Sequence, residues 1–397
     1  MMFFHPFHAP EKQRDPVKQL MLAGFFALSL WMFFLMTTRP SSDISIHAAW
    51  ASEGDFRDPT SFLHHGAHPM WHVLTAFLML FGLSLEWSAA IITALCKTAE
   101  VWLIHRLMTI ALHERFSRTA ITAFSAVCAL VSCLCVPFYN PTVYLGVGTP
   151  NTWHSCTQMI AMVWMLLCVP LTAYCFDHFK QLSNERAILP WREPVALGVM
   201  LFLSLLAKPT FMQAFLPAAC LFFLWQWIRH PRSSRFFLQV LVCVLPSIVF
   251  MIVQYLYYFG IIVPWQSSMV LELSVQKCLN VLVRVVLMQA FPLYTLWACR
   301  KQKKDTFFWL SLLMNVVGIV EFLILGEDGR RASDGNFGWG MMGAALMMWV
   351  AAMITFLREK NVQRPGWRLG IGWALLLWHL VSGVYYICYL LFTGAVL

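Results

Sequence analysis

Long apolar runs constrain this chain more than any other feature of its sequence. A membrane-spanning helix needs about 20 apolar residues, and most of the runs approach or exceed that length. Apolar residues make up 59% of the 397-residue chain and charged residues 12%, against roughly 45–50% and 25% in soluble domains. The sequence therefore predicts an all-α polytopic transmembrane bundle of about 11 spans, one integral membrane domain over residues 1–397. The runs cover residues 18–38, 88–111, 119–138, 153–175, 194–207, 210–228, 236–259, 278–298, 306–325, 337–357 and 369–393.

The basic residues predict how the bundle is oriented. Six clusters hold 20 of the 28 Lys and Arg residues, and such clusters lie on the cytoplasmic side of membrane proteins. All six share that side if the chain crosses once between residues 39 and 106. We therefore expect a cytoplasmic tail at 1–17, a first outer loop at 39–87 with an interfacial helix at 71–83, and the remaining spans in 88–397. The clusters lie in the N-terminal tail and in 106–118, 180–192, 229–235, 300–304 and 358–368.

The net charge of +9 follows from the same rule, so it does not indicate a nucleic-acid partner. The expected location is a cytoplasmic membrane, most simply a bacterial one, with the lipid bilayer as the surrounding partner. Most of the 12 cysteines lie inside apolar runs, and the chain has no CxxC pair. We expect these cysteines to be buried small hydrophobes and not disulfides or metal ligands.

The segments expected outside the membrane concentrate the ionisable side chains. They hold nine of the 19 acidic residues and five of the 13 histidines. Chemistry is therefore expected on the extracytoplasmic face. We find no internal repeat in the sequence, and the span interiors contain few ionisable groups, so a transporter or lipid flippase is the less favoured reading.

The first outer loop carries a carboxylate and imidazoles at helical spacing. Asp43 and His47 are four residues apart, so one helical turn would place them on one face. His68 and His72 have the same spacing, with Pro69 marking a helix start. Asp43 could accept a proton from a hydroxyl or bind a cation. Asp43, His47, His68 and His72 are candidate ligands of a divalent metal (Mg, Mn or Zn), while substrate hydrogen bonding or simple solvation is the alternative.

The second outer loop, residues 139–152, is rich in Gly, Pro and Asn, which is typical of a specifically folded turn. With the start of the next span it supplies amide, indole and imidazole groups. Proteins use such groups to hold sugars, so they are candidates for a substrate pocket. These residues are Asn140, Asn151, Trp153 and His154.

Three cations are candidates for binding phosphate. Lys208 precedes the helix-breaking Pro209 inside a long apolar stretch, where a lysine must snorkel or meet an anion. Arg330 and Arg331 lie in the last outer segment, against the charge rule, and arginine binds phosphate through two hydrogen bonds. Solvation of this acidic loop is the alternative. Lys97 and Glu100 are three residues apart within one span and are predicted to form a structural ion pair.

The order of these features resembles the GT-C superfamily of polytopic glycosyltransferases, which includes aminoarabinose and protein O-mannosyltransferases. The resemblance covers about the first 110 residues. Beyond them, only the general arrangement of spans and loops is similar. Two departures leave the metal and the donor open: Asp43 stands apart from the later acids of its loop, and His-Pro-Met replaces a Lys-Pro-Pro motif. The motifs are the early Asp43, His68-Pro69-Met70-Trp71 to Phe81-Gly82, Ser84-Leu85-Glu86, and the ending Glu327, Arg330, Gly335-Asn336-Phe337, Trp339-Gly340.

The resemblance implies an enzyme that moves a sugar from a polyprenyl-phosphate carrier to an acceptor glycan, lipid or protein outside the membrane. Asp43 would be the catalytic base, and Lys208, Arg330 and Arg331 would hold the lipid phosphate. An outer-leaflet polysaccharide polymerase or ligase is the nearest alternative. The substrate pocket would contain His47, His68, His72, Asn151, Trp153, His154 and Asn336.

Overall fold

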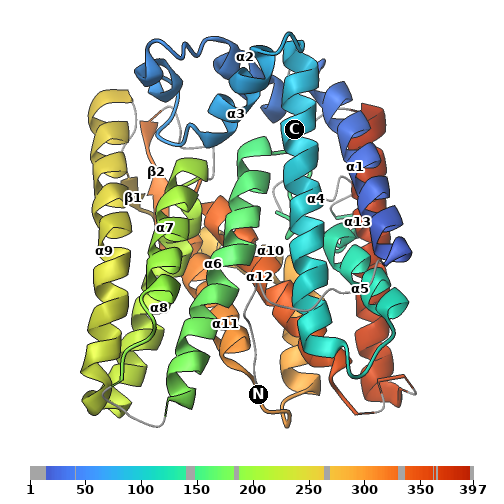
Figure 1. Ribbon diagram of the computed structural model, residues 1–397. Coiled ribbons are helices and arrows are strands. Elements are labelled where there is room, and N and C mark those ends of the chain that lie inside the picture. Colours follow the sequence, from blue (N-terminus) through green and yellow to red (C-terminus); the bar gives the residue numbers. More distant parts are fainter. Residues whose placement is uncertain are drawn as a thin grey trace.

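The computed structural model describes residues 15–40, 42–139, 148–182, 187–262, 269–329, 336–360, 362–363 and 365–393. Their fold confirms the predicted all-α polytopic bundle (Figure 1). The first third of the chain forms α1 (Pro16–Thr37), α2 (Asp43–Ser52), η1 (Pro59–Leu63), α3 (Met70–Met79), α4 (Leu85–Leu112) and α5 (Arg118–Leu130). The rest is α6 (Cys156–Gln181), α7 (Arg192–Ala207), α8 (Thr210–Arg229), η2 (Pro231–Ser233), α9 (Ser234–Tyr257), η3 (Tyr258–Ile262), β1 (Met269–Leu271), α10 (Val275–Ala298), α11 (Thr306–Ile324), β2 (Leu325–Glu327), α12 (Phe337–Leu357) and α13 (Trp367–Thr393).

Nine helices of the described part are long and apolar enough to cross a membrane: α1, α4, α6 and α8–α13. Two predicted spans are shorter than that. α7 has 16 residues and α5 has 13. The chain therefore has the layout of a multi-pass membrane protein, and two of the eleven predicted spans are helices that fall short of this length.

The predicted span at 119–138 is wrong in its second half, because α5 ends at Leu130 and the chain continues without helix. Tertiary contacts replace the helical hydrogen bonds there. The Ser132 amide donates to the His379 carbonyl of α13, and the Leu134 amide donates to the Leu287 carbonyl of α10. The chain passes so close to α13 that a Cβ at Gly383 would lie 1.7 Å from the Leu130 carbonyl oxygen. Buried irregular backbone is stable only when its polar groups are satisfied in this way.

The segment predicted as an interfacial helix is the ten-residue helix α3. At about 1.5 Å per residue its length is roughly 15 Å, which is half of a bilayer core. α3 buries Trp71 and His72 against the bundle and leaves Leu74 and Phe77 exposed. Its length agrees with the prediction that residues 71–83 do not cross.

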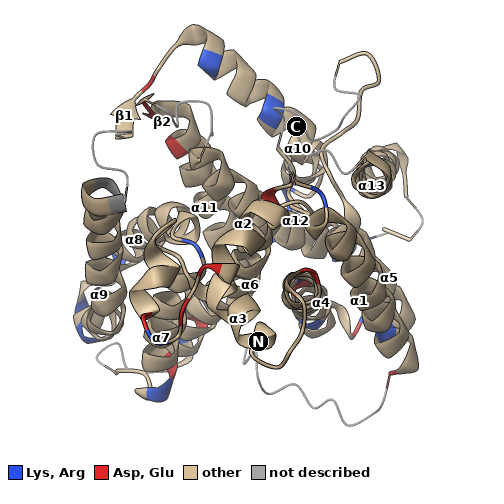
Figure 2. Cartoon of the chain, turned by 90° about the horizontal axis from the view of Figure 1, so that it is seen from above, with Lys and Arg blue, Asp and Glu red and all other residues tan. Residues whose placement is uncertain are grey.

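The two ends of the bundle differ in composition. α2 and α3 lie across the upper end in Figure 1, where α1 and α13 also end. The helix ends that flank the five later basic clusters all lie at the opposite end of the bundle. This agrees with the prediction that these clusters share one side of the membrane. Seen from above, few blue or red segments interrupt the tan helices (Figure 2). Which end faces the cytoplasm stays a prediction from the charge rule.

The long helix α12 forms the centre of the core. Its whole 18-residue apolar window is buried, as expected of a helix that is apolar all round. Small residues allow close packing: a Cβ at Gly318 of α11 would lie 3.0 Å from the Met341 Cα of α12. Trp339 lies in the first turn of α12, where its carbonyl accepts a hydrogen bond from Gln158 of α6 at 3.1 Å.

A two-stranded antiparallel sheet joins β1, which precedes α10, to β2, which follows α11. Lys277 strengthens this junction, since its Nζ lies 2.8 Å from Glu272 Oε2 and 2.9 Å from the Leu325 carbonyl oxygen. The sheet links the α9–α10 and α11–α12 connections at the α3 end of the bundle (Figure 1).

Candidate functional site

Helix α2 places Asp43 and His47 side by side. The Ser42 side chain caps the helix by accepting a hydrogen bond from the Ser45 amide at 3.0 Å, so α2 begins at Asp43. Asp43 Oδ1 then lies 3.7 Å from His47 Nε2. This geometry confirms the prediction that the two side chains share one face. Asp43 Oδ2 is buried and has no hydrogen-bond partner among the described residues.

Helix α3 brings His72 to the same place. Pro69 occupies the N-cap position, so His68 lies just before the helix, as predicted. His47 Nδ1 and His72 Nε2 are 2.9 Å apart and share one hydrogen bond, whose direction depends on the tautomers. The His68 ring centroid lies 6.5 Å from that of His47 and 6.4 Å from that of His72. His68 therefore borders the pair without joining its hydrogen bond.

Both paired imidazoles are electrically neutral near pH 7. Burial lowers the pKa of His47 well below its usual value, and the neighbouring His72 and Lys208 lower it further. Burial also lowers the pKa of His72 to about 4, and His65 adds to the effect while Asp43 opposes it. Neutral imidazole offers a lone pair, so it can accept a hydrogen bond or bind a cation.

The first turn of α6 adds a thiol and a hydroxyl to this site. One ligand atom from each of Asp43, His47 and Cys156 lies within 4.8 Å of the other two. Thr157, the next residue, accepts a hydrogen bond from Lys208 Nζ at 3.2 Å. The Lys208 ammonium also lies 4.2 Å from the centroid of the Trp339 ring. The predicted break at Lys208–Pro209 is confirmed, since α7 ends at Ala207 and α8 begins at Thr210.

His154 completes the group. Its Nδ1 lies 2.6 Å from the Tyr386 hydroxyl of α13, and its ring centroid is 5.5 Å from that of Trp339. Asp43 and Lys208 both interact electrostatically with His154 and with Cys156. We call the set of residues that these contacts bring together the polar cluster. It consists of Asp43, His47, His72, His154, Cys156 and Lys208.

Two residues expected in a sugar pocket have another place. The Asn151 amide donates to the Cys128 and Val131 carbonyls at 3.0 and 2.8 Å, so it caps the end of α5. Trp153 is buried beneath Lys97, whose Nζ lies 4.4 Å from the ring centroid. Both side chains are fully buried, so in this structure they support the loop from within.

The predicted ion pair inside α4 is confirmed. Lys97 Nζ lies 2.7 Å from Glu100 Oε1, and both side chains are fully buried. The same ammonium donates to Asn151 Oδ1 at 3.4 Å. The pair thus fastens residues 151–153 to α4, directly before the polar-cluster residues His154 and Cys156.

The last predicted segment is described only in part. Asn336 donates to Glu327 Oε2 at 2.7 Å, which closes the connection between β2 and α12. Arg330, Arg331 and Asn140 lie outside the described residues. Their predicted roles therefore stay predictions.

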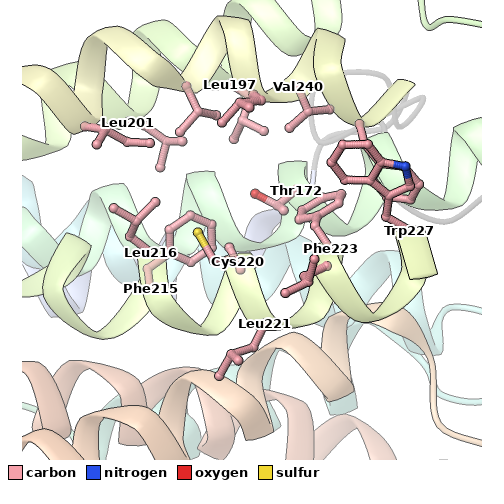
Figure 3. Close-up of a pocket in the computed structure, with 16 residues that line it drawn as sticks. Thr172, Leu197, Leu201, Phe215, Leu216, Cys220, Leu221, Phe223, Trp227 and Val240 are labelled. Carbon is pink, nitrogen blue, oxygen red and sulfur yellow. The ribbon is translucent and has the colours of Figure 1, made fainter. Parts of the chain in front are cut away.

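A separate apolar cavity of about 350 Å³ lies between α6, α7, α8 and α9 (Figure 3). Leu197 and Leu201 of α7 face Phe215 and Phe223 of α8 across it. Thr172 contributes a hydroxyl to its otherwise apolar lining. This cavity offers no groups for acid–base chemistry, but its surface suits a hydrocarbon chain.

Sequence reasoning missed four residues that the fold brings to the site. Cys156 and Thr157 sit beside the predicted His154 but carried no spacing signal. Trp339 belongs to a recognised motif, and only packing shows its position over Lys208. Tyr386 lies 232 residues from His154, so no local pattern could have linked them.

The polar cluster combines a carboxylate, neutral imidazoles, a thiol and an ammonium in a largely buried space. Such a set can accept a proton, stabilise an anion and hold a cation. Comparison with known proteins finds no family model that matches this chain and no curated protein that matches it significantly.

Proposed function

We propose that this protein is a glycosyltransferase that moves a sugar from a polyprenyl-phosphate carrier to an acceptor hydroxyl at the polar cluster. One observation carries the proposal. Asp43 and Cys156 belong to a set whose ligand atoms lie within 4.8 Å of one another. The residue after Cys156, Thr157, accepts a hydrogen bond from Lys208 Nζ at 3.2 Å, although Asp43 and Lys208 are 165 residues apart in the sequence. A base and a phosphate-binding cation therefore share one site.

The geometry suggests a role for each charged group. The acceptor hydroxyl gives its proton to Asp43 as its oxygen bonds to the anomeric carbon. The bond between that carbon and the carrier phosphate breaks, and the sugar-free carrier phosphate leaves with one more negative charge. The Lys208 ammonium, oriented by Thr157 and Trp339, stabilises that charge.

The apolar cavity supports a lipid-linked donor. Lys208 directly follows α7, and Leu201 of that helix lines the cavity seven residues earlier. At 1.5 Å per residue this places the cavity about 10 Å from the phosphate position, measured along α7. A carrier whose phosphate meets Lys208 can thus lay its isoprenoid chain between α7, α8 and α9.

The charge rule supports an extracytoplasmic site, and we propose a bacterial cytoplasmic membrane as the location of the protein. The polar cluster lies at the α2–α3 end of the bundle, and the later basic clusters flank the other end. Polyprenyl-linked sugars in the outer leaflet would then reach the site laterally, without crossing the bilayer.

Asp43→Asn tests the proposal directly, because an amide cannot take the acceptor's proton. We expect a loss of about 10²- to 10⁴-fold in transfer rate. Purified protein in proteoliposomes is supplied with a panel of labelled polyprenyl-phosphate sugars, and release of carrier phosphate is measured. Asp55→Asn is the matched control, since Asp55 is an exposed carboxylate of the same loop and its loss should leave the rate unchanged.

Retention of the full rate in Asp43→Asn would reject Asp43 as the base. Absence of carrier release from every donor in the wild type, with protein intact, would reject the transferase. Release that occurs only when a lipid-linked glycan is the acceptor would identify the polymerase or ligase form of the same chemistry.

A further inference from the structure

A carboxylate, an imidazole and a thiol from two distant segments lie close together within the polar cluster. Asp43 and His47 come from α2, and Cys156 comes from the first turn of α6. Their ligand atoms all lie within 4.8 Å of one another. Spacing alone could not reveal this set, because Cys156 is over 100 residues from the other two.

We propose that Asp43, His47 and Cys156 bind a zinc ion. In tetrahedral zinc sites the ligand atoms lie about 2.0–2.3 Å from the metal, so neighbouring ligand atoms are roughly 3.3–3.8 Å apart. The 3.7 Å between Asp43 Oδ1 and His47 Nε2 already matches such an edge. The limit of 4.8 Å for the whole set leaves only a small inward movement of the side chains.

Unsatisfied polarity at the site points to a ligand independently. Asp43 Oδ2 is buried without a hydrogen-bond partner among the described residues, and buried carboxylate oxygens are normally satisfied. The Cys156 thiol is fully buried and belongs to no disulfide. A metal bound to Asp43 Oδ1 and to the Cys156 sulfur would compensate the buried charge of this carboxylate and leave Oδ2 available to accept a proton.

The hydrogen bond between the two histidines fits a zinc ligand and its support. His47 would bind the metal through Nε2, which faces Asp43. Its Nδ1 would then carry the proton and donate it to His72 Nε2, 2.9 Å away. Metal-binding histidines commonly donate their second N–H to a fixed acceptor, which sets the tautomer and ring orientation. His72 is thus a positioning residue, and His68 lies outside the site.

The chemistry of the donor set selects among metals. A thiolate with imidazole and carboxylate favours zinc, whereas Mg²⁺ and Mn²⁺ prefer oxygen ligands. The thiolate and the carboxylate together balance the two charges of Zn²⁺. Three protein ligands leave a fourth position for water or a substrate oxygen, as in zinc sites that take part in reactions. The inference rests on these side chains and not on the transfer reaction, so metal binding and activity are scored separately.

The test uses the full-length protein in detergent, stripped with a chelator and then equilibrated with Zn²⁺ or Co²⁺ alone. We expect about one zinc per chain by mass spectrometry of metals. Co²⁺ should produce an ultraviolet charge-transfer band from a cobalt–thiolate bond. Cys156→Ser should abolish that band, and Cys168→Ser, an equally buried thiol of the same helix, should retain it. His72→Gln should weaken zinc binding by about 10- to 100-fold.

The Co²⁺ spectrum of the wild-type protein can overturn the proposal whatever the folding of the variants. A Co²⁺ spectrum without a thiolate band would exclude Cys156 as a ligand. Zinc uptake no greater than that of the His47→Gln/Cys156→Ser double variant would exclude the site. Zinc binding without any sugar transfer would support the metal site and reject the proposed enzyme.

Discussion

The protein buries two lysines in very different surroundings. Lys97 lies within α4, fully buried, with its Nζ 2.7 Å from Glu100 Oε1. Lys208 lies in the break between α7 and α8, 8% exposed, where it donates to the Thr157 hydroxyl and packs over Trp339. Both ammonium groups lie over an indole ring, at 4.4 and 4.2 Å. Their positions along helices differ: one is internal and the other is at an end.

This difference distinguishes a structural charge from the one that we propose to be functional. The charge of Lys97 is balanced by a carboxylate one helical turn away, so the pair is complete within α4. Lys208 lies where the helix is interrupted, within the polar cluster that also contains Asp43 and the neutral imidazoles. A buried charge is costly unless it is compensated, so the ion pair of Lys97 stabilises the fold. For Lys208 we propose an anionic ligand.

The two regions are joined by residues 151–157. Asn151 and Trp153 contact Lys97, while His154, Cys156 and Thr157 belong to the polar cluster or contact it. The ion pair therefore fixes the height at which α6 begins. Damage to the pair should disturb the cluster, whereas damage to the cluster should leave the pair intact.

The largest effect is expected from Glu100→Gln, which leaves the Lys97 charge buried without its carboxylate. Removing one partner of a buried pair costs about 3–5 kcal/mol of the free energy of unfolding. Thermal unfolding in detergent, followed by tryptophan fluorescence, should show a clear fall in melting temperature.

The double variant Lys97→Met/Glu100→Leu is the control for this prediction. Because both charges are removed together, its melting temperature should return close to the wild-type value or exceed it. Unchanged melting of Glu100→Gln would show that the pair does not stabilise the fold, and the distinction between the two lysines would be lost.

An intermediate effect is expected from Lys208→Met, which keeps the length and apolar body of the side chain but removes its charge. A hydrogen bond to a charged group is worth about 1.5–3 kcal/mol, so the KM for the lipid donor should rise about 10- to 100-fold. The melting temperature should stay close to that of the wild type, in contrast to Glu100→Gln.

Steady-state transfer kinetics in proteoliposomes measure this change. Lys180→Met is the control, since Lys180 is a half-exposed cation at the far end of α6. A normal KM in Lys208→Met, or an equal rise in Lys180→Met, would remove Lys208 as the phosphate-binding group.

The smallest effect is expected from filling the apolar cavity with Ala219→Trp. Ala219 lines the cavity from α8, so the indole would compete with an isoprenoid chain. We expect a several-fold loss of transfer from long-chain donors and little loss from donors with a short chain. The ratio of the transfer rates from long-chain and short-chain donors measures this loss independently of expression level.

Val199→Trp controls for added bulk, because Val199 is exposed on α7 and does not line the cavity. Its ratio of long-chain to short-chain rates should match the wild type. Equal losses with both donors in Ala219→Trp would indicate a general packing defect, and the cavity would have no role in binding the lipid chain.

Much of the architecture could be predicted from local patterns. The runs of apolar residues located the nine long helices, Pro209 located the break after α7, and the four-residue spacing placed Asp43 beside His47. Each of these depends on neighbours in the sequence. The end of α5 could not be predicted, because contacts with His379 and Asn151 replace its continuation.

By itself, the sequence determined that the chain forms a helical membrane bundle and which segments bring carboxylates and imidazoles to one end of it. These features depend on the length of apolar runs and on helical periodicity, which involve only neighbouring residues. Only the tertiary structure decided that Asp43, Cys156 and Lys208 converge, and that Asn151 and Trp153 support Lys97. The physical reason is that the packing of α12 and of residues 148–157 sets the positions of distant helices relative to one another along the bundle axis, and no local sequence pattern determines these positions.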